Sequence, residues 1–245
     1  MKKLFTLVVL LVLSLGVSAQ TQVVRIWNNG AFKAIPISEV DSITFFTRRE
    51  IPEHAVDLGL PSGTLWADRN VGAYTPEGYG IYFAWGEVQS KDSYNWDTYR
   101  LCKGANGMTK YCTNRYYGYN AFTDDKDVLD PSDDVATQKM GEEWRMPTCA
   151  EFEELVESCS WTWTTRNGID GYEVIGPNGN LIFLPATGYR SDIKYIGNGS
   201  LGYYWSCSLN VDYPKDAYYL CFNSEELRMY SNSRCYGRVV RAVVK

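Results

Sequence analysis

Hydrophobic and polar residues alternate along the last third of the chain. In the run 218–222, period-two geometry places Leu220 and Phe222, with Tyr218, on one face of a strand. Tyr219 and Cys221 then lie on the opposite face. The pattern predicts a strand with one side packed in a core and the other side exposed to solvent.

A second run, 227–230, repeats this division. Leu227 and Met229 are predicted to point inward, while Arg228 and Tyr230 point outward. Further strands are predicted from short apolar runs at 172–175, 181–184, 203–208 and 239–243, and residues 176–180 carry a hairpin signal.

Two helices are predicted ahead of most of these strands. The first begins at Asp130, with Pro131 at the first helical position, and ends at Gly141. The second begins at Thr148, which forms a capping box with Glu151. Its apolar residues recur at helical spacing and predict one buried stripe, formed by Phe152, Leu155, Val156 and Cys159. Two helices followed by a β-rich C-terminal half indicate an α+β domain.

The N-terminal part has a different organisation. Residues 1–19 contain two lysines, an apolar run and a small-residue site, the pattern of a secretory signal peptide. Residues 20–50 are expected to form a small β module with strands at 23–27, 34–37 and 42–46. The main domain is expected over 55–245. We therefore predict an exported protein at the cell surface, in the periplasm or outside the cell, with no transmembrane segment after cleavage.

Charge and composition narrow the classes of partner. The chain has 24 Lys and Arg against 29 Asp and Glu, and two of the basic residues lie in the predicted leader. An acidic balance argues against a nucleic-acid-binding surface. Tyrosine is abundant, with 19 residues, and together with frequent Gly this suits a turn-rich domain.

Seven cysteines in an exported chain make disulfides possible, and the odd number leaves at least one thiol unpaired within the chain. Cys102 and Cys112 flank a Gly-rich loop that they could close. The remaining connectivity is open.

Six ordered segments resemble the FISUMP-type major paralogous domain, over roughly residues 55 to 245. They are VDLGLPSGTLW at 56–66, YFAWGE at 82–87, WRMPT at 144–148, IFLPA at 182–186, YWS at 204–206 and GRVVRAV at 237–243. The resemblance implies an exported protein of the kind frequent in Bacteroidota. It also implies a C-type-lectin-like domain similar to formylglycine-generating enzymes, with Trp66, Trp85, Trp144 and Trp205 in its core.

The tail is also similar to C-type-lectin-like proteins diversified by retroelements, in which template adenines are mutated at Asn codons. The outward positions all carry residue types reachable from such codons: Tyr219, Cys221, Arg228, Tyr230, Ser231, Asn232, Ser233, Cys235 and Tyr236. Ordinary surface usage of Tyr, Ser and Asn explains the same residues. On either interpretation these nine form the predicted ligand-binding set, because Tyr and Arg dominate binding hot spots.

Candidate chemistry elsewhere is sparse. Asp124, Asp125 and Asp127 could offer oxygen ligands to Ca²⁺, although a solvated loop before a helix explains them equally. No other cofactor is indicated. His54, the only histidine, is expected to be an exposed linker residue, and Trp161 and Trp163 either stack on sugars or form a hydrophobic turn.

The sequence thus predicts a non-enzymatic binding protein that recognises a protein or glycan through its Tyr-rich C-terminal surface. Two alternatives stay open. One is an enzyme of the formylglycine-generating type. The resemblance implies two nearby catalytic cysteines for such an enzyme, but Cys221 and Cys235 have no matching local motif and fit disulfide partners or displayed thiols better. The other is a structural subunit of a surface assembly.

Overall fold

The computed structural model describes residues 23–28, 31–40, 51–104 and 107–244. The chain divides into two compact units, 1–50 and 51–245. The predicted leader, residues 1–19, and the predicted strand at 42–46 lie outside the described residues.

The described part of the first unit is a hairpin followed by one short helical turn. Strands β1 (Val23–Asn28) and β2 (Ala31–Pro36) pair antiparallel, and the 3₁₀ helix η1 (Ile37–Glu39) follows. Ile26 and Phe32 each remain 48% exposed. A two-stranded ribbon alone buries little apolar surface, and none of its residues whose burial is described is fully buried.

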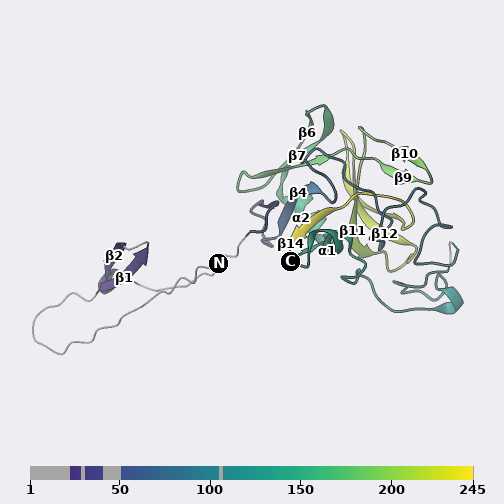
Figure 1. Ribbon diagram of the computed structural model, residues 1–245, viewed down its shortest axis with the longest axis horizontal. Coiled ribbons are helices and arrows are strands. Elements are labelled where there is room, and N and C mark those ends of the chain that lie inside the picture. Colours follow the sequence, from purple (N-terminus) through teal and green to yellow (C-terminus); the bar gives the residue numbers. More distant parts are fainter. Residues whose placement is uncertain (1–22, 29–30, 41–50, 105–106, 245) are drawn as a thin grey trace, which may run out of the picture. The chain divides into compact units, whose positions relative to one another are not determined.

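The second unit consists of several small antiparallel sheets (Figure 1). One has the order β3 (Ala55–Asp57), β4 (Leu65–Asn70), β14 (Arg241–Val244), β5 (Trp144–Arg145). Another is the meander β6 (Ser160–Arg166), β7 (Ile169–Ile175), β8 (Leu181–Pro185). The third is β11 (Gly202–Leu209), β12 (Asp216–Phe222), β13 (Leu227–Ser233), and β9 (Tyr189–Ser191) pairs with β10 (Lys194–Ile196).

Two α-helices occur among the described residues. In α1 (Val135–Met140), Asp134 is the N-cap and accepts hydrogen bonds from the backbone of Ala136 and Thr137. The predicted start at Asp130 is therefore wrong: residues 131–133 form a turn, and the capping carboxylate comes one turn later. Gly141 ends the helix with φ of 111°, as predicted.

The second helix, α2 (Cys149–Ser158), has the predicted capping box between Thr148 and Glu151. Phe152 and Leu155 are buried, whereas Val156 and Cys159 at the edge of the stripe are only half-buried. The helix packs on β11, β12 and β13 and closes one face of that sheet.

The predicted α+β, C-type-lectin-like class is wrong. The described fold is β-rich, and its two helices span only six and ten residues. A segment expected to be a turn, with Trp161 and Trp163, is the strand β6, which pairs along its whole length with β7. The described residues of the stretch 71–130, which are 71–104 and 107–130, form turns, isolated bridges and the 3₁₀ helix η2 (Tyr119–Ala121) rather than helices that would cover a sheet.

Two hydrophobic clusters form the core, and they meet across the β11–β12–β13 sheet. Leu220 and Tyr204 belong to one cluster and their neighbours Tyr219 and Trp205 to the other. Because adjacent residues of a strand point to opposite faces, both faces of the sheet are packed at its centre. The predicted core tryptophans are confirmed: Trp66, Trp85, Trp144 and Trp205 are each at most 3% exposed.

All seven cysteines are free thiols, so Cys102 and Cys112 do not close their loop. Within the described residues, no helix combines the length and hydropathy needed to cross a bilayer.

Candidate functional site

The face of the β11–β12–β13 sheet that carries Trp205 and Tyr219 has a row of aromatic rings. Register places Trp205, Tyr219 and Tyr230 opposite one another on the three strands. Tyr219 is stacked between Tyr203, at 5.6 Å between ring centroids, and Tyr230, at 6.3 Å. The row is rigid because the opposite face of the sheet is held by α2 and the buried Leu220 and Phe222.

An open depression of about 400 Å³ lies along this row. Its lining comes from β11 and the residue before it, from β12 and β13, and from the turn between the last two strands: Leu201, Tyr203, Tyr219, Cys221, Phe222, Asn223, Glu226, Arg228, Tyr230, Ser231 and Asn232. The size is that of a small-ligand site rather than of a whole protein interface. A second hollow of about 520 Å³, beside α1, has no aromatic lining residue.

Six of the nine predicted ligand-binding residues line the depression: Tyr219, Cys221, Arg228, Tyr230, Ser231 and Asn232. Ser233, Cys235 and Tyr236 do not. Tyr236 instead packs against Tyr189, with 5.6 Å between ring centroids. The sequence analysis did not predict three other lining residues, Tyr203, Asn223 and Glu226. Tyr203 could have been found, because the alternation within residues 203–208 places it on the same side of the strand as Trp205.

Two predicted surface positions are in fact buried. Tyr219 is 6% exposed because it lies on the middle strand and is covered by rings from both neighbouring strands. Cys235 is 1% exposed, since the chain turns inward after β13 and places its thiol in a core cluster. Neither is a freely displayed side chain, although Tyr219 still forms part of the wall of the depression.

The thiols near the depression are poor nucleophiles. Burial raises the pKa of Cys221 above its usual value, and the hydroxyl of Tyr203 offsets only part of that shift. Burial raises the pKa of Cys235 to about 12. A thiol that stays protonated at neutral pH is unsuited to covalent catalysis.

Arg238 lies behind the tyrosine row. It comes from the segment that runs beside β11, where the backbone N–H of Trp205 donates to Val239. Its guanidinium carbon is 3.7 Å from the ring centroid of Tyr219 and 4.0 Å from that of Trp205. The side chain is 1% exposed, and its Nε and Nη1 atoms have no hydrogen-bond partner within the described chain.

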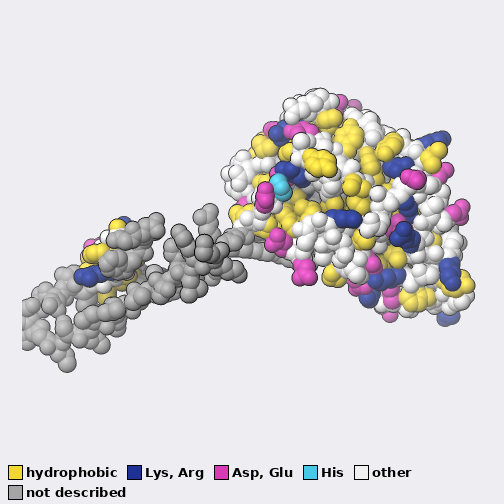
Figure 2. Space-filling model, viewed as in Figure 1, with side chains coloured by type: hydrophobic (Ala, Val, Ile, Leu, Met, Phe, Trp, Pro, Cys, Tyr) yellow, Lys and Arg dark blue, Asp and Glu magenta, His cyan; other side chains and the backbone are white. Residues whose placement is uncertain are grey.

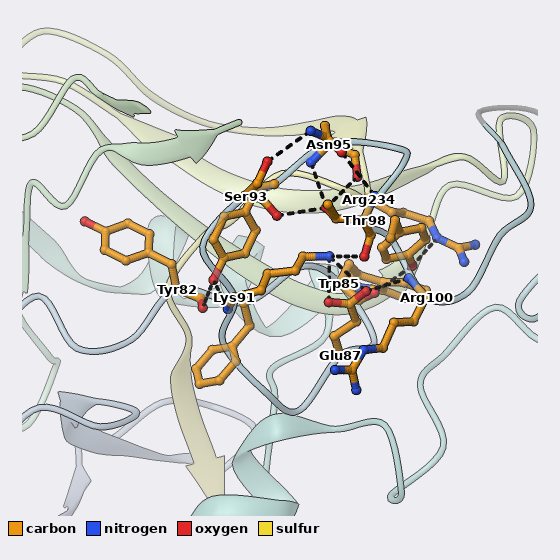
Figure 3. Close-up of polar contacts among 12 residues, drawn as sticks. Tyr82, Trp85, Glu87, Lys91, Ser93, Asn95, Thr98, Arg100 and Arg234 are labelled. Atoms are coloured by element: carbon orange, nitrogen blue, oxygen red, sulfur yellow. Dashed lines mark hydrogen bonds and ion pairs between the residues drawn. The ribbon is translucent and has the colours of Figure 1, made fainter. Parts of the chain in front are cut away.

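A second polar cluster occupies the loop 85–100 (Figure 3). Lys91 extends between Glu87, at 2.8 Å, and the carbonyl of Thr98, at 2.9 Å. The Glu87 carboxylate also accepts from the backbone N–H of Arg100. These charges satisfy one another, so the cluster fixes the loop rather than offering a group to a ligand.

The acidic loop does not assemble a metal site. Asp124 accepts hydrogen bonds from the backbone N–H groups of Tyr111 and Cys112, both at 2.8 Å, while Asp125 and Asp127 are exposed. Over the described ranges, no three potential ligands are grouped closely enough to hold a metal ion. The Asp124 carboxylate instead holds the backbone of the loop in place through these two hydrogen bonds.

Other charged side chains are dispersed. On the face drawn in Figure 2, basic and acidic groups are interspersed among polar and hydrophobic ones. His54 is exposed, in a turn before β3, and its Nδ1 is 3.4 Å from the Asp68 carboxylate. It does not line either hollow.

No family model matches the sequence, and no curated protein or solved structure matches the chain. The resemblance to the FISUMP-type domain therefore stays a prediction that depends on the six quoted segments.

Proposed function

We propose that this is an exported, non-catalytic binding protein that recognises a protein or glycan at the tyrosine-lined depression of β11–β12–β13. The observation that carries the proposal is convergence: aromatic, hydroxyl, amide and guanidinium groups from three strands line one hollow. Export is supported by the leader-like sequence at 1–19.

Recognition follows from the physical properties of the lining. Arg228 is exposed, and its guanidinium carbon lies 4.5 Å over the ring of Tyr230, which is 38% exposed. These two side chains can bury apolar area against a ligand while their polar ends fix its orientation. Because the tyrosines are already held by their neighbours, little side-chain entropy is lost on binding.

The test is an array of glycans and proteins probed with the full-length protein and with the triple variant Arg228→Ala, Tyr230→Ala, Asn232→Ala. All three residues are exposed and line the depression. We expect the variant to keep its melting temperature within a few degrees. Its affinity for any ligand found should fall at least about 100-fold, because two hot-spot side chains are lost and each contributes about tenfold or more.

Tyr74→Ala is the matched control, because Tyr74 is 94% exposed and does not line the depression. It should bind as the native protein does. Equal binding by the triple variant and the native protein would place the recognition surface elsewhere.

A further inference from the structure

Three arginines near the C-terminus are buried, and one of them differs from the other two. Arg234 donates to the Tyr99 hydroxyl and to the carbonyls of Lys110, Tyr111 and Pro214. Arg241 donates to Asn70 and to two carbonyls. Arg238, equally buried, makes none of these bonds: its Nε and Nη1 are unpartnered, and it forms no ion pair with a described residue.

Aromatic rings offset part of this desolvation. The guanidinium carbon of Arg238 lies within 6 Å of five ring centroids, those of Tyr189, Tyr203, Trp205, Tyr219 and Tyr236. Cation–π contacts stabilise a charge but do not supply the hydrogen-bond acceptors that buried N–H groups require. Burial lowers the pKa of Arg238 to about 10, which still leaves the guanidinium charged at neutral pH.

Arg238 lies next to the depression without lining it. Its guanidinium carbon contacts the rings of Tyr203 and Tyr219, and both of these tyrosines line the hollow. The other cation of the lining, Arg228, is already paired with Glu226 at 2.6 Å. Arg238 is thus a positive charge beside this site that forms no ion pair with a described residue, and its low-dielectric surroundings strengthen its field.

We propose that the depression binds a sugar unit that carries a carboxylate, as found in an acidic glycan. The inference rests on the proposed function and specifies its ligand. The volume of about 400 Å³ fits one or two sugar rings, and the Tyr, Ser and Asn side chains of the lining can hydrogen-bond their hydroxyls. The carboxylate lies at the wall formed by Tyr203 and Tyr219, the two lining rings that contact the guanidinium of Arg238.

The experiment uses full-length protein and pairs of glycans that share one backbone, one member carrying uronate or sialate groups and the other neutral. We expect the native protein to prefer the acidic member at least tenfold. Arg238→Met should remove this preference, so that the acidic and neutral members bind equally, whereas Arg238→Lys, which keeps the charge, should retain part of it.

A spectroscopic readout is independent of the variant's folding. In the native protein, the Nε–H resonance of Arg238, assigned by its loss in Arg238→Lys, should shift on addition of the acidic glycan and not of its neutral partner. An unchanged Nε–H resonance under saturating acidic glycan overturns the proposal.

Other outcomes separate this inference from the proposed function. Binding confined to neutral glycans or to acidic peptides, still lost in the triple variant of the depression, would leave the proposed function in place and overturn the acidic-sugar assignment. An acidic preference that survives Arg238→Met would also overturn it. Binding unaffected by the triple variant would contradict the proposed function itself.

Discussion

Tyr219 and Tyr230 show how far neighbours decide the role of a residue. They are the same residue type, point to the same face and lie opposite one another on adjacent strands. Tyr219 is 6% exposed and Tyr230 is 38% exposed. The middle strand has rings on both sides, whereas β13 is an edge strand with a ring on one side only.

The two tyrosines should therefore differ in their contribution to stability. We expect Tyr219→Ala to lower the free energy of unfolding by about 3 kcal/mol, because it removes a buried ring and leaves a cavity against Arg238 and Trp205. Tyr230→Ala should cost no more than about 1 kcal/mol. Urea denaturation of both variants measures the difference, and equal losses would contradict the burial of Tyr219.

At the scale of single elements, the start of α2 is stabilised by interactions between residues that are close together in the sequence. Thr148 and Glu151 cap each other, and Arg145, four residues before the helix, holds the Glu151 carboxylate through two hydrogen bonds of 2.5 and 2.6 Å. Burial raises the pKa of Glu151, but the bonds from Arg145 and from the Thr148 backbone outweigh this and hold the pKa below its usual value.

This lowered pKa makes α2 sensitive to acid. The stabilisation by ionised Glu151 is fully present above about pH 4.5, the pKa of this carboxyl in the unfolded chain. It is lost as the pH falls through the lower pKa that the carboxyl has in the folded protein. We expect Glu151→Gln to cost about 2 kcal/mol at pH 7 and progressively less below pH 4. Thermal unfolding from pH 7 to pH 3 measures this, with the exposed Glu157→Gln as control. A loss that is the same at every pH would contradict an ionic role.

Elements with strong local signals could be predicted from the sequence. The capping box located α2, and the 176–180 turn located the hairpin of β7 and β8. By contrast β4, which lies between β3 and β14, is buried over its first three residues and shows no alternation. Strand β6 was missed because its Trp and Thr residues fit a turn as well as a strand until β7 is seen beside it.

The same limit applies to the candidate site. Alternation within β12 and β13 placed four lining residues, Tyr219, Cys221, Arg228 and Tyr230, because both strands follow one another in the chain. Arg238 could not be assigned in this way. Its segment contacts β11 through a bridge between Tyr204 and Val239, so its position depends on residues more than thirty places earlier. Long-range packing, rather than local pattern, decides which charge lies behind the tyrosines.

At the scale of the whole second unit, the C-terminal segment joins parts that are distant in sequence. Arg234 connects it to the loop around residues 99–111 and to Pro214, and Arg241 connects it to β4 and β8. A guanidinium suits this role because its five donors satisfy several buried carbonyls from one side chain.

Removing Arg234 should therefore loosen the loop as well as lower stability. Arg234→Met keeps much of the packing volume but leaves the carbonyls of Lys110, Tyr111 and Pro214 without their donor. We expect a loss of at least about 3 kcal/mol, since buried polar groups are left unsatisfied, together with faster amide hydrogen exchange at Tyr111 and Cys112. Arg228→Met is the control, because that side chain is exposed and should change stability by less than about 0.5 kcal/mol. If exchange at Tyr111 and Cys112 were unchanged while stability fell, Arg234 would stabilise the core through its contacts with the rings of Trp85 and Tyr99, without holding this loop.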